Sequence, residues 1–214
     1  MNPVRRISAA TVLAGALLFA GHDSSQAQVV PEPAMLTARV PITETFQAYV
    51  AFPDNSFVMG GMIRFPITRD ADLGGRAGLW IIDDASDTPF AGADLRYGLL
   101  GRPLKPGGGE LSLALNFGVG VSDPGRTTWK FPFGFIVGID FGLGPGDAEL
   151  FANPRLELGV RSNPSGSDAA LLLDVGALFP IAQSLGANVS IRFGDGLFDE
   201  GDQIVVGLGA TWQL

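Results

Sequence analysis

The stretch TWKFPFGFIVGIDFG, residues 128–142, carries a large apolar side chain at every second position. Successive side chains of a β-strand point to opposite faces of a sheet, so this spacing predicts a strand with one continuous apolar face. On the other face, Ile136 is the only large apolar side chain among residues such as Lys130, Gly134 and Asp140. The apolar face must contact either a protein core or the hydrocarbon of a lipid bilayer. It consists of Trp129, Phe131, Phe133, Phe135, Val137, Ile139 and Phe141.

The same alternation recurs from residue 42 to the end of the chain, and no helical period is sustained over a normal helix length. Stretches rich in Gly, Pro, Asp and Ser separate the alternating runs and predict short turns between antiparallel strands. Each run is close to the length that a tilted strand needs to cross a bilayer. A further strand at 35–40 is also compatible with the sequence, so we expect about ten strands, within a range of eight to twelve. The ten runs cover residues 42–52, 57–67, 73–81, 91–99, 110–122, 128–142, 150–161, 169–179, 184–193 and 203–214.

Prolines mark two positions where the ladder of backbone hydrogen bonds must change. Pro132 and Pro154 fall inside expected strands, and proline has no N–H to donate, so we expect a bulge or a local break at each. Pro89 and Pro103 fall in expected turns and require no such adjustment.

The first 27 residues have the pattern of a secretory signal peptide. Arg5 and Arg6 precede the uncharged run ISAATVLAGALLFA, which is short for a membrane span, and Ser25 and Ala27 are small residues at the positions that signal peptidase reads. We expect cleavage after Ala27; the other interpretation is an N-terminal membrane anchor. Residues 28–41 show no clear alternation and form a separate N-terminal segment, so the barrel would comprise residues 42–214.

Two architectures can use these strands. A soluble, secreted, lipocalin-like barrel would turn the apolar faces inward and carry an apolar ligand. A membrane barrel would turn them toward lipid, and three features favour it: the apolar faces are too bulky for a small barrel interior, the polar faces are rich in glycine, and aromatic residues concentrate toward the strand ends. A closed barrel also satisfies every strand's backbone groups in lipid. We therefore predict an all-β, antiparallel, up-and-down transmembrane β-barrel.

The chain resembles the small outer-membrane β-barrel proteins of Gram-negative bacteria, most specifically in its last residues, GATWQL. The last strand of that family carries an assembly signal of glycine and alternating hydrophobic residues that closes on an aromatic. Gly209, Trp212 and Leu214 fit the spacing, although the final residue here is leucine. The resemblance implies localisation in the cell outer membrane with periplasmic termini, so that residues 28–41 are periplasmic. It also implies contact with outer-membrane lipid and lipopolysaccharide, and recognition of the last strand by the barrel-assembly machinery.

The composition excludes several chemistries. The only histidine is His22, inside the signal peptide, and there is no cysteine, so a Ser-His or Asp-His arrangement and a histidine-ligated metal site are excluded from the mature chain. We expect no enzyme, no catalytic residue, no cofactor and no bound metal. The acidic loop GDGLFDEGD, residues 194–202, could hold divalent ions through oxygen ligands, but acidic turns are usually solvated. Loss of Arg5, Arg6 and Asp23 with residues 1–27 takes the formal net charge from −8 to −9, which argues against nucleic acid as a partner.

The polar faces of the strands are expected to line the lumen. One interpretation is a charged pore that passes small solutes; the other is that opposite charges pair and fill a narrow barrel. Ten-stranded barrels are near the size that side chains fill, and buried charges must be paired, so the second is favoured. We predict a narrow or plugged pore with a structural or passive small-solute role. The expected lumen-lining residues are Arg64, Arg76, Asp94, Arg96, Glu110, Lys130, Asp140, Arg155, Glu157, Arg161, Asp174 and Arg192.

Overall fold

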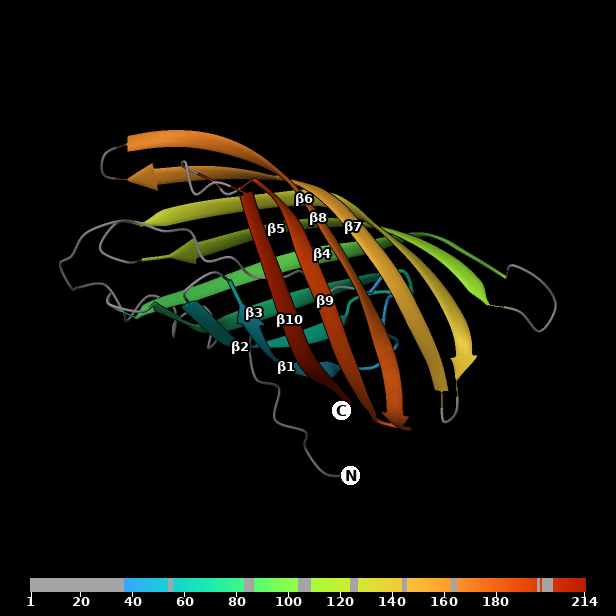
Figure 1. Cartoon of the computed structure of the whole chain (residues 1–214). Coiled ribbons are helices and arrows are strands. Elements are labelled where there is room, and N and C mark those ends of the chain that lie inside the picture. The colour runs from blue at the N-terminus through green and yellow to red at the C-terminus, as the bar shows by residue number, and fades with distance from the viewer. Residues whose placement is uncertain are drawn as a thin grey trace, which may run out of the picture.

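The computed structural model describes residues 37–53, 56–82, 87–103, 109–123, 127–143, 146–162, 165–195, 197 and 202–214. The strands in this part of the chain are β1 (Thr45–Phe52), β2 (Ser56–Pro66), β3 (Ala71–Ile82), β4 (Thr88–Pro103), β5 (Glu110–Ser122), β6 (Thr128–Leu143), β7 (Gly146–Ser162), β8 (Ser165–Ala182), β9 (Leu185–Asp195) and β10 (Asp202–Gln213). Each strand pairs antiparallel with its sequence neighbours, and β1 pairs with β10, so the sheet closes into a barrel (Figure 1). The prediction of a closed, up-and-down, ten-stranded barrel is confirmed. Among the described residues, no helix is long and apolar enough to span a membrane.

We call the end at which β1 begins and β10 ends the proximal end, and the opposite end the distal end. Several strands are longer than the alternating runs, and β7 and β8 contain 17 and 18 residues. About 9–11 residues are enough to cross a bilayer, so these strands extend beyond it. Asp72 lies in β3 rather than in a turn, and Glu149 lies in β7 ahead of the expected run. The hydrogen-bond ladder between neighbouring strands includes both residues, because the paired backbone N–H and C=O groups satisfy one another up to the hairpin turn.

The prolines interrupt the ladder without adding a residue. Between β5 and β6, Phe117 pairs with Phe133, and the next pair is Gly120 with Lys130 in the same register. The unpaired stretch between them contains Pro132. The β6–β7 ladder skips Pro154 in the same way, so the expected local breaks are present and the expected bulges are not. Register shifts lie instead between positions 98 and 100 and between positions 180 and 182. Pro89 and Pro103 were expected in turns but lie at the two ends of β4.

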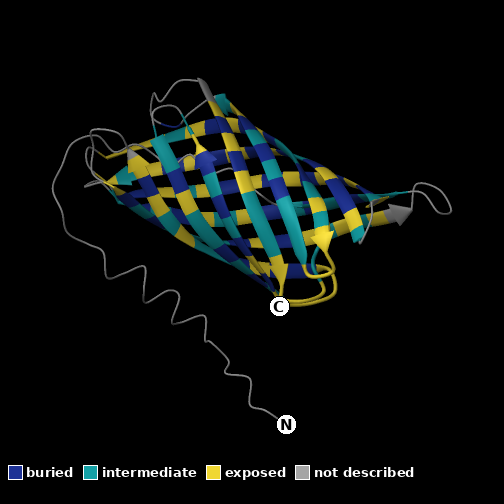
Figure 2. Ribbon diagram, turned by 60° about the horizontal axis from the view of Figure 1, so that its bottom comes forward, coloured by how far each residue is buried: buried dark blue, intermediate teal, exposed yellow. Residues whose placement is uncertain are grey.

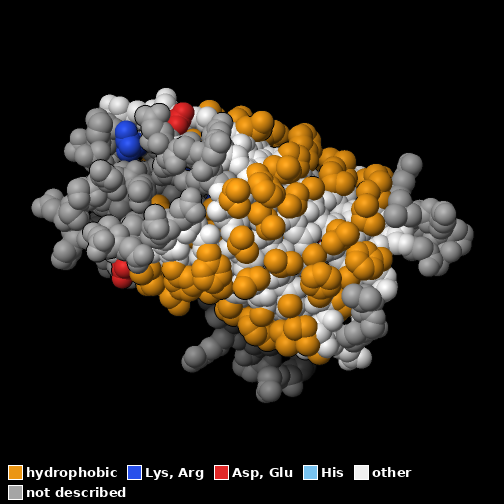
Figure 3. Space-filling view, in the orientation of Figure 1, with side chains coloured by type: hydrophobic (Ala, Val, Ile, Leu, Met, Phe, Trp, Pro, Cys, Tyr) orange, Lys and Arg blue, Asp and Glu red, His pale blue; other side chains and the backbone are white. Residues whose placement is uncertain are grey.

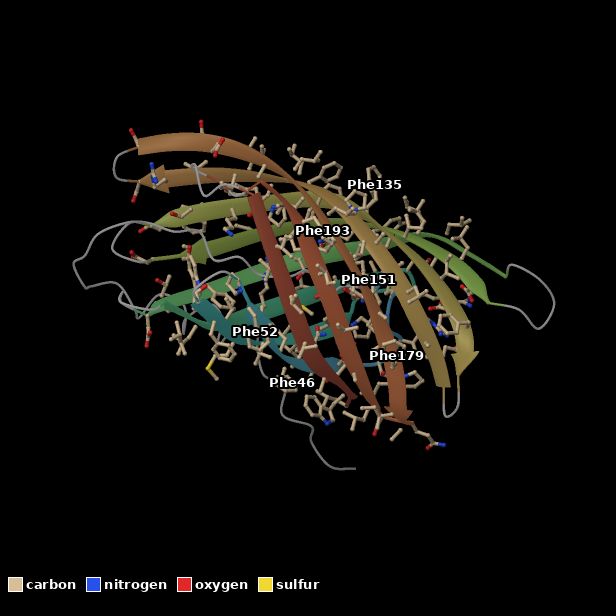
Figure 4. The ribbon with its side chains drawn as sticks, in the orientation of Figure 1. Phe46, Phe52, Phe135, Phe151, Phe179 and Phe193 are labelled. Carbon is tan, nitrogen blue, oxygen red and sulfur yellow. The ribbon has the colours of Figure 1, made fainter. Side chains whose placement is uncertain are left out.

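The alternation of the sequence appears on the barrel wall as alternating exposed and buried residues (Figure 2). On β6 the exposed positions are the apolar ones, including Phe131, Phe133 and Phe135. Phe135 is on the outer surface, whereas Phe151 on β7 is buried inside (Figure 4). In the space-filling view, hydrophobic side chains cover the barrel wall, and the visible charged side chains lie at one end of the molecule (Figure 3). The apolar faces therefore point outward.

Glycines on the inner faces make room for large neighbours. Tyr49 lies against Gly60, where a Cβ would be 2.6 Å from its ring, and Phe90 lies against Gly78, where a Cβ would be 2.5 Å from Cζ. No other residue fits under these rings without displacing them. The glycine-rich polar faces therefore accommodate a filled interior.

Candidate functional site

The first group of interior charges lies on three adjacent strands, β2, β3 and β4. Arg64 contacts Asp72, and its Nη2 is 2.7 Å from Oδ1 of Asp94. Arg96 donates from Nη2 to Oδ2 of Asp72 at 2.5 Å. All four side chains are buried. In this β2–β4 charge cluster, two arginines and two aspartates balance one another away from bulk water.

The second group lies on the opposite part of the wall, on β6 to β9. Asp174 lies between Arg155 and Arg192, with Nε to carboxylate oxygen distances of 3.2 and 3.1 Å. Glu157 lies 3.2 Å from Nζ of Lys130 and 3.9 Å from Nη2 of Arg155. The register brings these groups together, because Asp174 is directly opposite Arg192 on the neighbouring strand. This β6–β9 charge cluster also consists of paired charges.

A third group, on β5, β6 and β7, is acidic. Glu110 is directly opposite Asp140, and Asp140 is directly opposite Glu149, so three carboxylates lie side by side in what we call the acidic row. Asp140 and Glu149 are buried, and Glu110 is half-buried. Like charges in directly opposite positions are destabilising unless a positive group or a proton compensates them.

The residues that precede β1 supply hydrogen-bond and ion-pair partners beside the acidic row. The backbone N–H of Ala38 donates to Oε1 of Glu149 at 2.5 Å. Nη1 of Arg39 lies 2.9 Å from Oδ2 of Asp147, and this hydrogen bond raises the pKa of Arg39 above its usual value. The described part of the expected N-terminal segment thus lies at the proximal mouth of the barrel.

One side of the distal lumen, along β1 to β4 and β10, is apolar. Side chains from β1, β2, β3, β4 and β10 pack together there, and all of them are buried. The ring of Trp80 and the ring of Phe90 are the bulkiest members contributed by β3 and β4. We call this group the distal apolar cluster: Tyr49, Ala51, Val58, Trp80, Phe90 and Val205.

The expected lumen-lining residues fall into two groups by burial. Those that are buried are Arg64, Asp94, Arg96, Asp140, Arg155, Glu157, Asp174 and Arg192. Those that are half-buried are Arg76, Glu110, Lys130 and Arg161.

Two central carboxylates, Asp72 and Glu149, are not among the lumen-lining residues predicted from the sequence, because the predicted strands began too late. Extending each alternation by one step toward the N-terminus would have found both, since Asp72 shares parity with Arg76 and Glu149 shares parity with Arg155. Trp80, Phe90 and Phe151 were not predicted to be interior either, because each is a single apolar residue on an otherwise polar or small face.

Most of the acidic loop, at positions 196 and 198–201, lies outside the described residues. Asp199 and Glu200 lie outside the described residues. Within the part of the chain that the structure describes, no group of three or more Asp, Glu, His or Cys side chains has the arrangement to hold a metal ion.

The inner and outer surfaces together decide the environment of the molecule. The interior contains two clusters of charged side chains, and the wall exposes rows of Phe, Leu, Val and Ile. A soluble carrier requires the reverse arrangement, so the lipocalin-like alternative is wrong. Only a closed barrel satisfies all its strand hydrogen bonds in lipid, and membrane barrels place polar residues inside and apolar residues outside. The chain is a transmembrane β-barrel.

Comparison with solved structures finds other barrels at low sequence identity. The transmembrane β-barrel is similar to the N-terminal β-barrel domain of Pseudomonas aeruginosa OprF, with 14% identity, 80% of this chain and 97% of that chain covered, and a TM-score of 0.38. It is similar to the β domain of the Bordetella autotransporter BrkA, with 12% identity, 80% and 98% covered, and a TM-score of 0.48. It is also similar to the outer membrane enzyme PagL, with 12% identity, 79% and 99% covered, and a TM-score of 0.39. No protein-family description and no curated protein matches the sequence.

Proposed function

We propose that this chain is a non-enzymatic barrel of the cell outer membrane, exported by cleavage after Ala27, whose lumen is closed and whose main role is structural. The observation that carries the proposal is the filling of the lumen. Two clusters of paired charges and the distal apolar cluster occupy the interior, where an open channel needs free polar surface and water.

The charge clusters support closure because they are costly to open. Asp72 and Asp174 each contact two arginines inside the barrel. Removing one partner from a buried ion pair leaves an uncompensated charge, so the pairs hold their side chains in place. A solute passing through the lumen would have to separate them.

The distal apolar cluster supports closure in a different way. Constrictions lined by hydrophobic side chains exclude water and thereby block ions. Trp80 and Phe90 contribute large rings to such a constriction, and both are buried.

The non-enzymatic part of the proposal rests on composition. Residues 28–214 contain neither histidine nor cysteine, the usual general base and thiol nucleophile of hydrolases and transferases. Incubation of the folded barrel with phospholipid and lipopolysaccharide should leave both chemically unchanged by mass spectrometry. Turnover that depends on the folded barrel would contradict this part.

The proposed partners follow from the outer surface and the last strand. Outer-membrane lipid would contact the exposed apolar side chains, and lipopolysaccharide would contact the distal loops. The barrel-assembly machinery would bind β10, in which Gly209 and Trp212 have the spacing of the assembly signal described above.

A passive route for small solutes is the second candidate, and one observation favours it. A cavity of about 420 Å³ lies at the proximal end, lined by polar side chains that include Gln47, Asn188 and Thr211. The cavity is large enough for a small polar solute and could be the entrance of a narrow path.

Conductance in a planar bilayer distinguishes the two candidates. The refolded full-length barrel, first checked for a migration shift on unheated gels, is expected to give no steady conductance in potassium chloride. An open general porin inserted in the same bilayer is the positive control. Stable conductance steps from the wild-type barrel would overturn the closed lumen and support the solute route.

A further inference from the structure

The segment before β1 enters the barrel. Ala38 is only 2% exposed, whereas Ile42, four residues later, is 82% exposed. Ala38 packs with Met62 of β2, Ile136 of β6 and Phe151 of β7, all of them buried interior side chains. From here on, the N-terminal segment means residues 37–43, which comprise the described part of the expected segment 28–41 and the next two residues. Its first described residues lie inside the wall, and its last ones lead out to the proximal rim.

Polar contacts from two sides of the lumen hold the backbone of this segment. Nη1 of Arg96, on β4, donates to the carbonyl oxygen of Thr37 and lies 3.2 Å from its Oγ1. The N–H of Ala38 donates to Glu149, on β7. The segment therefore bridges β4 and β7 across the lumen, with a cation on its carbonyl and an anion on its amide.

Glycines shape the wall to accept the segment. A Cβ at Gly138 on β6 would lie 2.8 Å from Cβ of Ala38, closer than side-chain atoms tolerate. A Cβ at Gly98 on β4 would lie 3.4 Å from Cγ2 of Val40. A wall carrying larger residues at position 138 could not hold Ala38 where it lies.

The acidic row explains why the segment binds there. Glu110, Asp140 and Glu149 lie side by side, and Asp147, two residues before Glu149 on β7, lies at the same rim. The segment contributes an amide N–H to Glu149 and a guanidinium, from Arg39, to Asp147. The guanidinium places a positive charge beside the row, and the amide N–H donates a hydrogen bond to one of its carboxylates.

We propose that the N-terminal segment is a plug that docks in the proximal mouth, and that the acidic row together with Arg96 is its receptor. The plug deepens the proposed function, on which it rests, because it closes the end of the lumen opposite the distal apolar cluster. Undocking would expose the acidic row and open the mouth to water.

Thiol labelling tests docking directly, because the chain has no cysteine of its own. Ala38→Cys and Ile42→Cys are made separately in the full-length chain, refolded, and exposed to a water-soluble maleimide. The thiol at position 38 should react more slowly than the thiol at position 42 by about tenfold or more. This ratio is the factor by which one hydrogen bond to a charged group favours the docked over the undocked segment. Equal rates in the folded barrel would overturn the plug.

A pair of second-site changes tests the receptor. Glu149→Ala in the Ala38→Cys background removes the acceptor of the Ala38 N–H, and labelling should accelerate toward the rate at position 42. Asp168→Ala in the same background is the matched control, because Asp168 lies near the distal end of β8, at the opposite end of the barrel from the segment, and accepts from the N–H of Ala169. Its loss should change labelling little. Acceleration by both changes, or by neither, would contradict the assignment of Glu149.

A disulfide gives an independent test that leaves the acidic row intact. Val40→Cys with Gly98→Cys places the new side chains in contact, so mild oxidation of the folded barrel should form an intramolecular bond. Ile42→Cys with Gly98→Cys is the control, expected not to cross-link. Absence of the bond at position 40 would argue against docking. These readouts do not depend on conductance. A conducting wild-type barrel would overturn the closed lumen, and the labelling rates would still show separately whether the segment is docked.

Discussion

Both Nε and Nη2 of Arg96 donate to Oδ2 of Asp72, at 3.0 and 2.5 Å, in the interior of the barrel. The other carboxylate oxygen of Asp72 accepts from Arg64. One aspartate thus links two strands on either side of its own, and Asp174 does the same between Arg155 and Arg192. These two residues are the centres of the networks that fill the lumen.

The first prediction concerns Asp72. Asp72→Ala leaves Arg64 with one carboxylate partner and removes the two hydrogen bonds that Arg96 makes to Asp72, so it should lower the free energy of unfolding by about 3–5 kcal/mol. Urea titration of the barrel in detergent micelles, followed by gel migration, measures the change. Asp147→Ala, in the half-exposed pair with Arg39, should cost about 0–1 kcal/mol. Equal losses at the two positions would show that the buried network contributes no more than a surface pair.

The second prediction concerns the glycines of the inner wall. A Cβ at Gly134 would lie 2.6 Å from both Cβ of Arg155 and the carbonyl oxygen of Pro154, and a backbone oxygen cannot easily move. Gly134→Ala should therefore destabilise the barrel by about 1–3 kcal/mol. Gly166→Ala is the matched control, because a Cβ there meets no atom within 4 Å. The same unfolding titration separates them, and a neutral Gly134→Ala would mean that β6 and β7 do not approach as closely as described.

The third prediction concerns the outer wall. Phe135 lies in the middle of β6 on the exposed face, where a membrane barrel meets the centre of the bilayer. Phe135→Arg should cost about 2–4 kcal/mol of folding free energy in lipid vesicles. Ser167→Arg, near the distal end of the long strand β8, should cost little, because charges near the interface cost about 0–1 kcal/mol. Folding yield into vesicles, measured for both, tests the depth dependence, and a tolerated Phe135→Arg would place that face outside the bilayer.

The fourth prediction concerns the distal apolar cluster. Trp80 is 5% exposed inside the barrel, and its neighbour Leu79 is 41% exposed on the outer wall. Trp80→Ala removes the largest ring of the cluster, so it should admit water and give conductance steps that are absent from the wild-type barrel. Leu79→Ala, which changes the lipid-facing side of the same strand, should not. If Trp80→Ala remains silent while folding normally, the seal lies in the charge clusters or at the proximal mouth.

The sequence by itself determined which side of each strand faces lipid. The alternation at residues 128–142 is enough to place Phe133 and Phe135 outside and Asp140 inside, because side-chain direction along a strand depends only on the parity of the position. The number of strands and their order also followed from local patterns, since short turns between neighbouring runs permit only antiparallel pairing. The absence of histidine and cysteine after the signal peptide needed no structure at all.

Only the tertiary structure decided which interior residues meet. Parity places Arg96 on the inner face, but its contact with Asp72 depends on the register between β3 and β4. That register is set by the turn between the strands and cannot be predicted from the alternation. The strand ends depended on the same ladders, and for that reason Asp72 and Glu149 were missed. Closure of the sheet then brought β4 and β7 close enough for Arg96 and Glu149 to hold the same backbone segment. Residues 37–43 carry no pattern that predicts this position. Their hydrogen bonds to the wall are made with groups more than fifty residues away in the chain, which only the closed barrel brings together.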